Sequence, residues 1–565
     1  MSEPTLAEKV QRLELLYKVG IALSAEKDKD RLVEMILLEA KQLCHADGGT
    51  LYLRTDDDHL KFAIMRTDSL GIALGGTTGK DIELPPIPMY RDGEPNEANV
   101  ASCAALRRRS FNIPDAYDAE GFDFSGTKSF DERNHYRSKS FLTIPLVNNE
   151  DRVIGVLQLL NARDPSDGAL VPFSVENQQI VEALASQAAI ALDNQMLLEG
   201  QKELLESFIK MIAAAIDAKS PYTGGHCERV PILTEMLAAA ACEADEGPLG
   251  DFRLTPEEWY ELRIAAWMHD CGKVTTPVHV MDKATKLETL FDRIHIVRAR
   301  FEVLRREAEL RYWRGVAEGG DEQRLKAELD DELARLDDDL AFLETANIGG
   351  EFLPPEKQAR ISEIGKRPYQ EGSDEHTLLS DDEIYNLQIS RGTLTAEERL
   401  IINGHMVQTI KMLEALPFPR NLRRVPEYAG GHHEKMDGTG YPKGLFAGDM
   451  SIPARIMAIA DVFEALTAQD RPYKKGKTLS ESMRIMGFMV KDNHLDPDLF
   501  ALFVTSGMYR EYGKRFLPPE LLDEVNEAEL LAIQPKPFDL PGEDVRRSRW
   551  QDFLEEYREQ ATRGR

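Results

Sequence analysis

The chain has 565 residues and a formal net charge of −29, from 98 acidic and 69 basic residues. A chain of this length holds two or more domains, each with a core of its own. The acidic excess argues against binding to DNA and against attachment to anionic membranes. It does not exclude a small anionic ligand, because such a ligand responds to the local charge of its site.

Three features predict a cytoplasmic protein without a membrane span. The N-terminal residues MSEPTLAEKV do not read as a signal peptide. No run of about 18 apolar residues is present. The five cysteines contain no CxxC pair, which favours reduced thiols. They are Cys44, Cys103, Cys227, Cys242 and Cys271.

Residues 1–175 mix helical and strand patterns and predict an α+β sensor domain. Apolar residues at helical spacing come first, and a helix is expected to begin again near Ser174. A loop rich in glycine and proline covers about 68–110. The last two strands form a hairpin around a short polar turn. The expected strands are 50–55, 59–67, 140–148 and 152–162.

This region resembles a GAF domain over about 150 residues. The resemblance rests on FDERNHYRSKSFLTIPLVNNEDRVIGVLQLLNARD (130–164) and FSVENQQIVEALASQAAIAL (173–192). It implies a module that binds a ligand or dimerises. The segment FDERNHYRSKS is most similar to GAF domains of the cyclic-nucleotide type, so a nucleotide is one expected ligand. The alternative is a GAF domain that only dimerises or transmits a signal.

A connecting helix is expected over 176–218, between the sensor domain and the rest of the chain. Its residues step by four and three, which predicts a heptad seam and a parallel homodimer. The alternative is one long helix packed on its own domains. The expected seam is Leu184, Ala188, Ala191, Gln195, Leu198, Lys202, Leu205, Ile209, Ile212 and Ile216.

Two pairs of adjacent polar residues distinguish the region 219–512. Adjacent imidazoles, as in His432-His433, point in different directions and are more natural as metal ligands than as core residues. In His269-Asp270 the carboxylate can bridge two ions. Imidazoles with a bridging carboxylate favour zinc, iron or manganese over calcium or magnesium. Asp461 lies in an otherwise apolar helix, where a carboxylate is costly unless it is paired or metal-bound.

These residues occur in one order with several further motifs, and the whole series resembles the HD-GYP family of bacterial cyclic di-GMP phosphodiesterases. The resemblance implies an all-α HD-type metallohydrolase domain. The motifs are His226-x-x-Arg229, His269-Asp270-x-Gly272-Lys273, His405, His432-His433, Asp437-Gly438-x-Gly440-Tyr441-Pro442, Asp461 and Arg471-Pro472-Tyr473-Lys474.

The same resemblance implies two divalent transition-metal ions, iron or manganese, with zinc or nickel as alternatives. Asp270 would bridge them and act in catalysis with Lys273, which would bind the phosphate. The ligands of the first ion would be His226, His269, Asp270 and Asp461. Those of the second would be Asp270, His405, His432 and His433. The implied substrate-binding residues are Lys273, Gly440, Tyr441, Pro442, Arg471 and Lys474.

The expected function is hydrolysis of cyclic di-GMP to pGpG or GMP, regulated by the GAF domain. Two metal ions about 3.5–4 Å apart neutralise a phosphodiester and generate a nucleophile at neutral pH. One alternative is a catalytically weak receptor or a scaffold that contacts other signalling proteins. Another is a phosphodiesterase for a different cyclic dinucleotide.

Three departures from the family pattern bear on the site. Some members have a glutamate four residues before the first histidine, which can support a third metal, but this chain has Tyr222 there. Two metals are therefore expected. His405 lies unusually far beyond His269, and His295 competes with it for the ligand position. The Leu-Thr-x-Glu-Glu helix start ahead of His405 favours His405.

The long spacing reflects a charged insertion over 300–390. Its leucines predict a helical hairpin or lid, with a solvated helical arm as the alternative. The expected stripe is Leu325, Leu329, Leu333, Leu336 and Leu340. Residues 513–565 alternate proline-rich stretches with a short amphipathic helix and are expected to form a packing tail.

Overall fold

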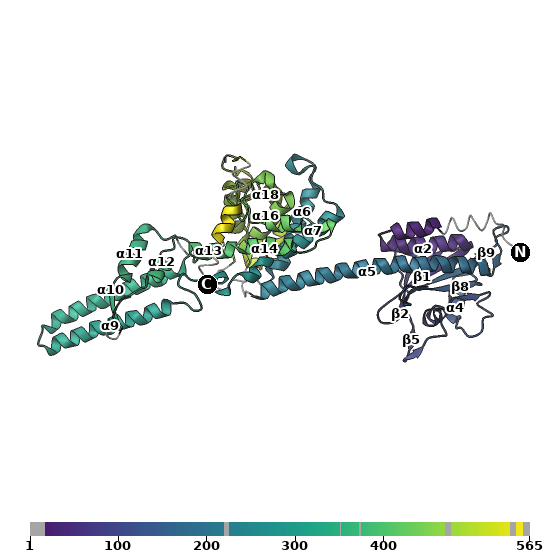
Figure 1. Cartoon of the computed structure of the whole chain (residues 1–565), viewed down its shortest axis with the longest axis horizontal. Coiled ribbons are helices and arrows are strands. Elements are labelled where there is room, and N and C mark those ends of the chain that lie inside the picture. Colours follow the sequence, from purple (N-terminus) through teal and green to yellow (C-terminus); the bar gives the residue numbers. More distant parts are fainter. Residues whose placement is uncertain are drawn as a thin grey trace. The chain divides into compact units, whose positions relative to one another are not determined.

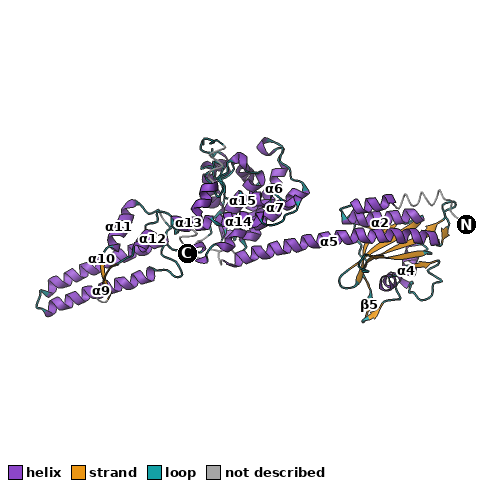
Figure 2. Ribbon diagram, in the orientation of Figure 1, coloured by secondary structure: helices purple, strands orange, loops and turns teal. Residues whose placement is uncertain are grey.

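The computed structural model describes residues 17–219, 225–350, 352–371, 374–468, 476–542 and 550–557. The chain forms two compact units, Met1–Leu205 and Glu206–Arg565. Figures 1 and 2 show strands and helices together in the first unit and mainly helices in the second. The expected fold class, an α+β domain joined to an all-α domain with a helical insertion, is confirmed.

The first unit is built on an antiparallel sheet with the order β3-β2-β1-β9-β8-β7. Side chains of alternate residues enter two different cores, so Leu51 packs with α2 and α5 and Tyr52 packs with α3. The predicted hairpin is β8 and β9. The strands are β1 (Ala46–Arg54), β2 (His59–Thr67), β3 (Ile72–Gly75), β4 (Ile87–Pro88), β5 (Tyr90–Arg91), β6 (Glu94–Pro95), β7 (Phe111–Ile113), β8 (Phe141–Val147), β9 (Val153–Arg163) and β10 (Leu170–Val171).

The helices of this unit lie on both faces of the sheet (Figure 1). The predicted loop at 68–110 is wrong in part, because it contains β3 and α3. Asn99 caps α3 by accepting hydrogen bonds from two backbone N–H groups. The helix has mostly small residues, so its apolar periodicity is weak in sequence. The helices are α2 (Lys29–Cys44), α3 (Val100–Arg107) and α4 (Ser125–Asn134), followed by α5 (Val175–Lys219).

The expected heptad seam on α5 is buried in part, and its exposed members are Leu198, Lys202, Leu205 and Ile212. Leu184 and Ala188 are buried in the core of the first unit. Ile209 and Ile216 are buried in the core of the second. Residues already packed inside their own chain are not available to a partner helix.

The second unit is a helical bundle around one large core. Apolar residues of α6, α7, α15, α16 and α18 meet there. Capping boxes at Thr255 and Thr395 begin two of its helices, α7 and α13. The main helices are α6 (His226–Glu243), α7 (Pro256–Met268), α8 (Val278–Met281), α13 (Ala396–Asn403), α14 (His405–Glu414), α15 (Val425–Gly430), α16 (Ile452–Thr467), α17 (Leu479–Lys491), α18 (Pro497–Thr505), α19 (Met508–Phe516) and α20 (Glu527–Leu531).

The insertion forms a helical hairpin with a core of its own (Figure 1). α9 (Ile294–Ala317) and α10 (Glu322–Ile348) pack together through Phe301, Leu304 and Leu336. Of the predicted stripe, Leu329 and Leu336 are buried and the other three leucines are half-buried. The remaining elements are α11 (Pro355–Gly365), β11 (Pro368–Glu371), β12 (Asp374–Thr377) and α12 (Asp381–Leu387).

The C-terminal residues pack on the bundle. Leu530 of α20 is buried in the main core. Residues 550–557 are helical, and Phe553 lies 6.5 Å from Tyr441, ring centre to ring centre. None of the helices in the described part of the chain is long and apolar enough to cross a membrane.

Candidate metal centre

All seven residues expected as metal ligands come together in the helical unit. The N-terminal ends of α6 and α14 each supply a histidine. The C-terminal end of α7 supplies the His-Asp pair, the turn after α15 supplies the paired histidines, and α16 supplies the second aspartate. They form two groups that share one carboxylate, and within each group the candidate ligand atoms lie within 4.8 Å of one another. The groups are His226, His269, Asp270 and Asp461, and Asp270, His405, His432 and His433.

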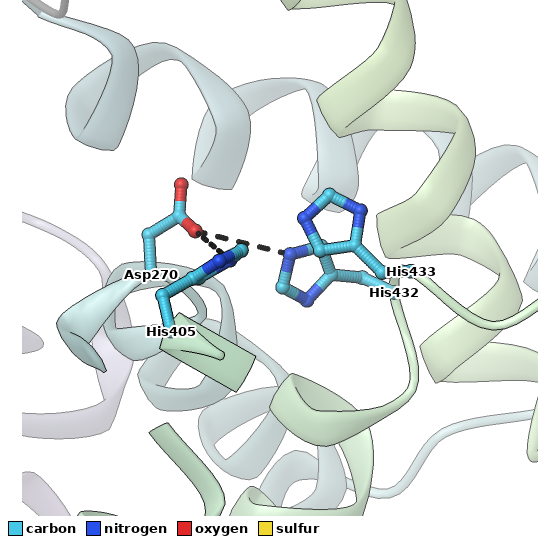
Figure 3. Close-up of side chains that lie close together, drawn as sticks. All are labelled: Asp270, His405, His432 and His433. Carbon is cyan, nitrogen blue, oxygen red and sulfur yellow. Dashed lines mark ion pairs between the residues drawn. The ribbon is translucent and has the colours of Figure 1, made fainter. Parts of the chain in front are cut away.

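The Asp270 carboxylate turns one oxygen toward each group. Its Oδ2 lies 3.3 Å from His226 Nε2 and 3.1 Å from His269 Nε2. Its Oδ1 lies 3.3 Å from His405 Nε2 and 4.0 Å from His432 Nε2. Figure 3 shows this second side, with the imidazoles of His405 and His432 directed at the carboxylate. A carboxylate in this position is suited to bridge two cations.

Several atoms of the centre are buried without a hydrogen-bond partner among the described residues. They are Asp270 Oδ1, His405 Nε2 and His432 Nε2. Buried polar atoms are normally paired, because burial without a partner costs about 1–3 kcal/mol each. Three such atoms around one point, all of metal-ligating types, fit a cation. Imidazole and carboxylate donors together suit a transition metal.

The backbone fixes which nitrogen of each ring faces the centre. The Nδ1 of His269 lies 2.7 Å from Ala266 O, and that of His432 lies 2.7 Å from Ala429 O. His405 makes the same contact with the carbonyl three residues earlier. Donation from Nδ1–H to these carbonyls leaves the lone pair on Nε2, which points into the centre.

His226 is oriented by a residue that the sequence reasoning missed. Its Nδ1 contacts Glu464 Oε2, and Arg229 donates a hydrogen bond of 2.7 Å to the other oxygen, Oε1. Only 1% of the Glu464 side chain is exposed. The signal was present, because Glu464 follows Asp461 by three residues and so lies on the same face of an apolar helix.

The protonation states favour cation binding at most positions. Burial lowers the pKa of His432 to about 4, and burial together with His432 lowers the pKa of His433 as well. Burial would raise the pKa of Asp270, but Lys273 and His269 hold it well below its usual range. The imidazoles of His432 and His433 are therefore neutral, and the Asp270 carboxylate is charged. These are the forms that bind metals.

His226 differs from the other rings. Burial would lower its pKa, but the neighbouring carboxylates of Asp270, Asp461 and Glu464 raise it well above the usual value. The ring therefore carries a proton at neutral pH, and a cation would have to displace it.

The turn after Asp270 is held close to α14. A Cβ built on Gly272 would lie 2.0 Å from the backbone oxygen of His405, so only glycine fits there. The Gly272 N–H donates a 2.9 Å hydrogen bond to Thr409 Oγ1. This packing places Lys273 Nζ 2.6 Å from Asp270 Oδ2.

A cavity of about 300 Å³ adjoins the centre. His433 and Asp461 form one wall, and apolar side chains with His494 and Lys477 form the others. The sequence reasoning did not identify His494. The complete lining is His433, Asp461, Val462, Ala465, Leu466, Ala468, Gly476, Lys477, Met489 and His494.

The Gly-Tyr-Pro turn packs against the same centre. The Tyr441 ring stacks on His433 with 4.9 Å between ring centres. A Cβ on Gly440 would lie 2.4 Å from a backbone nitrogen, so the turn requires glycine there. Glu434 holds the turn by accepting a 2.7 Å hydrogen bond from the N–H of Lys443. Pro442 is buried in the turn.

The remaining expected residues lie elsewhere. Arg471, Lys474 and Tyr222 lie outside the described residues. His295 is exposed on α9, where its Nδ1 lies 3.1 Å from a nitrogen of Arg298. His405, and not His295, is the histidine that the structure brings into the centre.

Two domain families match the chain. A GAF domain model matches residues 28–192, and an HD domain model matches residues 381–499. The HD match contains His405, His432, His433 and Asp461. The insertion separates it from the earlier ligands at His226 and His269.

Several curated proteins are similar to parts of the chain. A 3'3'-cGAMP-specific phosphodiesterase 3 of Vibrio cholerae is 25% identical over 58% of this chain and 42% of its own length. A 3'3'-cGAMP-specific phosphodiesterase 1 of the same organism is 42% identical over 20% of this chain and 25% of its own. A cyclic di-GMP phosphodiesterase of Pseudomonas aeruginosa is 47% identical over 21% and 28%. The chain thus spans less than half the length of each of these relatives.

Proposed function

We propose that this chain, which combines a GAF domain with an HD domain, is a metal-dependent phosphodiesterase that hydrolyses a cyclic dinucleotide. The observation that carries the proposal is the Asp270 carboxylate, whose two oxygens face two separate sets of imidazoles. The names of the relatives support the same reaction class.

The residues present fit two divalent transition-metal ions, for which we propose iron or manganese, with zinc or nickel as alternatives. His226, His269 and Asp461 would hold one ion, and His405, His432 and His433 the other. Asp270 would serve both. When bound, two such ions neutralise a phosphodiester and supply the nucleophile for its hydrolysis.

The side chains around the centre would orient the substrate. Lys273 offers a positive charge beside Asp270 and would pair with a phosphate oxygen. The adjoining cavity has apolar walls from Leu466 and Met489, which suit one face of a base. His494, on the same cavity, can hydrogen-bond to an edge of the base. The stacked ring of Tyr441 would hold the ring of His433 in its orientation.

We propose cyclic di-GMP as the substrate, with pGpG or GMP as product. 3'3'-cGAMP is the second candidate, because two of the relatives are named for it. Both carry two purine bases and the same kind of phosphodiester, so the chemistry at Asp270 and Lys273 would be shared. The walls of the cavity would make the distinction.

We also propose that the GAF domain regulates this site through the C-terminal end of α5. Lys219, the last residue of α5, donates hydrogen bonds of 3.1 Å and 2.6 Å to the carbonyls of Lys273 and Thr276. Asp217, one half-turn earlier, accepts a 3.2 Å hydrogen bond from the N–H of Cys227, next to His226. The end of this helix therefore contacts the segments that carry His226 and Lys273.

The test is metal analysis of the purified protein together with turnover of both dinucleotides. Asp270→Asn is the inactive control. Glu235→Gln, at a half-buried carboxylate of α6 that pairs with Arg263, is the matched control for a carboxylate outside the centre. We expect about two metal ions per chain and hydrolysis that depends on them. Metal-loaded protein that binds either dinucleotide but cleaves neither would favour a receptor and overturn the enzyme proposal.

A further inference from the structure

Residues 550–557 form a short amphipathic helix that packs on the helical unit. Its apolar side chains recur at the spacing of one helical face, and the polar side chains between them are exposed. Leu554 is buried, and the three aromatic side chains are half-buried. The helix is therefore held to the unit by one face, and the segments beneath that face are the ones it can influence. The apolar face consists of Trp550, Phe553, Leu554 and Tyr557.

Tyr557 packs against the start of α14, where the candidate ligand His405 lies. A Cβ built on Gly404, the residue before His405, would lie 1.9 Å from a carbon of the Tyr557 ring. Gln408, one turn after Gly404, donates a 3.3 Å hydrogen bond to the Tyr557 hydroxyl. The aromatic ring therefore lies directly against the backbone that carries His405.

The other two aromatic residues of the helix contact the Gly-Tyr-Pro turn. The rings of Phe553 and Tyr441 are nearly parallel, with an angle of 13° between their planes and 6.5 Å between their centres. Tyr441 in turn stacks on His433, with 4.9 Å between ring centres. Lys443 Nζ lies 5.7 Å from the centre of the Trp550 ring. Phe553, Tyr441 and the candidate ligand His433 thus form one row of stacked rings.

We infer that the 550–557 helix positions the ligand group that contains His405 and His433, an inference that rests on the proposed metal-dependent function. The two histidines come from separate segments, the start of α14 and the turn after α15. The helix contacts the first segment through Tyr557 and the second through Phe553. Ligands on separate segments bind a cation tightly only when the contacts behind them fix their spacing. Both contacted ligands belong to one group, so the other group should be unaffected.

Metal titration of the full chain against a competing chelator tests this role. We expect Phe553→Ala to weaken the binding of one of the two ions by about 10- to 100-fold and to leave the other unchanged. Phe553→Tyr keeps an aromatic ring behind Tyr441 and should bind both ions as the wild-type chain does. Glu555→Ala, on the exposed face of the same helix, is the matched control and should also bind both ions normally.

A second variant acts on the other ligand of the group. Tyr557→Ala removes the ring that packs against Gly404, and we expect it to weaken the same ion as Phe553→Ala. Far-UV circular dichroism and the midpoint of urea unfolding should stay near wild type in both variants, because both side chains are only half-buried. A general loss of folding would move these two readouts, whereas a loss of positioning moves the affinity for one ion.

The possible failures can be told apart. Two ions bound with unchanged affinity in both alanine variants would overturn the positioning role alone. Equal weakening in the Glu555→Ala control, or equal weakening of both ions, would overturn it as well. A wild-type chain that binds no metal would contradict the proposed function and this inference with it.

Discussion

Two buried aspartates, one in each unit, have opposite surroundings. Asp47 in the first unit is 3% exposed and Asp270 in the second is 2% exposed. Asp47 is satisfied by its own chain, since Ser69 and Tyr136 donate to Oδ2 and Arg163 donates to Oδ1. Asp270 faces the Nε2 atoms of imidazoles, and its Oδ1 has no hydrogen-bond partner among the described residues.

This contrast separates a structural carboxylate from a ligand. Donors of the chain itself hold the pKa of Asp47 below its usual value, against burial, which acts in the opposite direction. Nothing more is needed to keep its charge buried. The backbone fixes the Nε2 atoms of His269, His405 and His432 as acceptors. Among the described residues Asp270 Oδ1 therefore has no donor, and a cation would satisfy it. The following predictions test this distinction.

Replacing Asp270 should have the largest effect on activity. Asp270→Asn keeps the size of the side chain but removes the charge that the two ligand groups share. We expect both metal ions to be lost and turnover to fall by roughly a thousandfold or more. Metal analysis and product chromatography check this. Retention of two metals in the variant would show that Asp270 does not bridge them.

The matching change at Asp47 should affect stability instead. Asp47→Asn weakens charge-assisted hydrogen bonds to Arg163 and its neighbours, which should destabilise the GAF domain by about 2–3 kcal/mol. Urea unfolding monitored by circular dichroism measures the effect, with metal content as the control. Loss of metal from this variant, with the GAF domain still folded, would contradict a purely structural role for Asp47.

Glu464→Gln should weaken metal binding without abolishing it. Glutamine fills the same space but loses the charge that orients His226 and pairs with Arg229. Changes to such outer partners typically lower metal affinity by about 10- to 100-fold. Titration with a competing chelator measures the affinity, and Glu235→Gln provides the control. An unchanged affinity would mean that Glu464 serves only the packing of α16.

Metal affinity should rise with pH, by up to about tenfold per unit. The carboxylates around His226 raise its pKa, so the metal-free protein holds a proton there at neutral pH. Raising the pH removes this competing proton and favours the cation. Calorimetry in buffers of different ionisation enthalpy should detect proton release on metal binding. The Glu464→Gln variant should release less, and an affinity that does not change between pH 6 and 8 would contradict the assignment.

The smallest effect is expected at the cavity. His494→Ala removes a side chain that lines the cavity but lies outside both ligand groups. We expect the KM for the dinucleotide to rise by roughly tenfold while kcat and metal content stay near wild type. A fall in kcat alone would place His494 nearer to the reacting phosphate.

The sequence determined the fold class, and through the family resemblance it predicted the members of the candidate centre. Adjacent histidines, a His-Asp pair and an aspartate in an apolar helix carry their chemistry in residue type, so they could be found without coordinates. Strand patterns on either side of a polar turn predicted the β8–β9 hairpin, and the Leu-Thr-x-Glu-Glu motif predicted the start of α13. Short elements made of small residues, such as α3, left too weak a pattern to be predicted.

Only the tertiary structure decided which faces and partners these residues have. Burial within the two units removes four residues from the expected seam of α5, which the heptad pattern alone does not show. They are Leu184, Ala188, Ile209 and Ile216. The role of Glu464 depends on the approach of α6 to α16, from residues more than 200 positions apart. The structure likewise brings His405 next to Asp270, although the insertion separates the two residues in sequence. Their approach depends on close packing at Gly272, a tertiary contact that no local sequence pattern records.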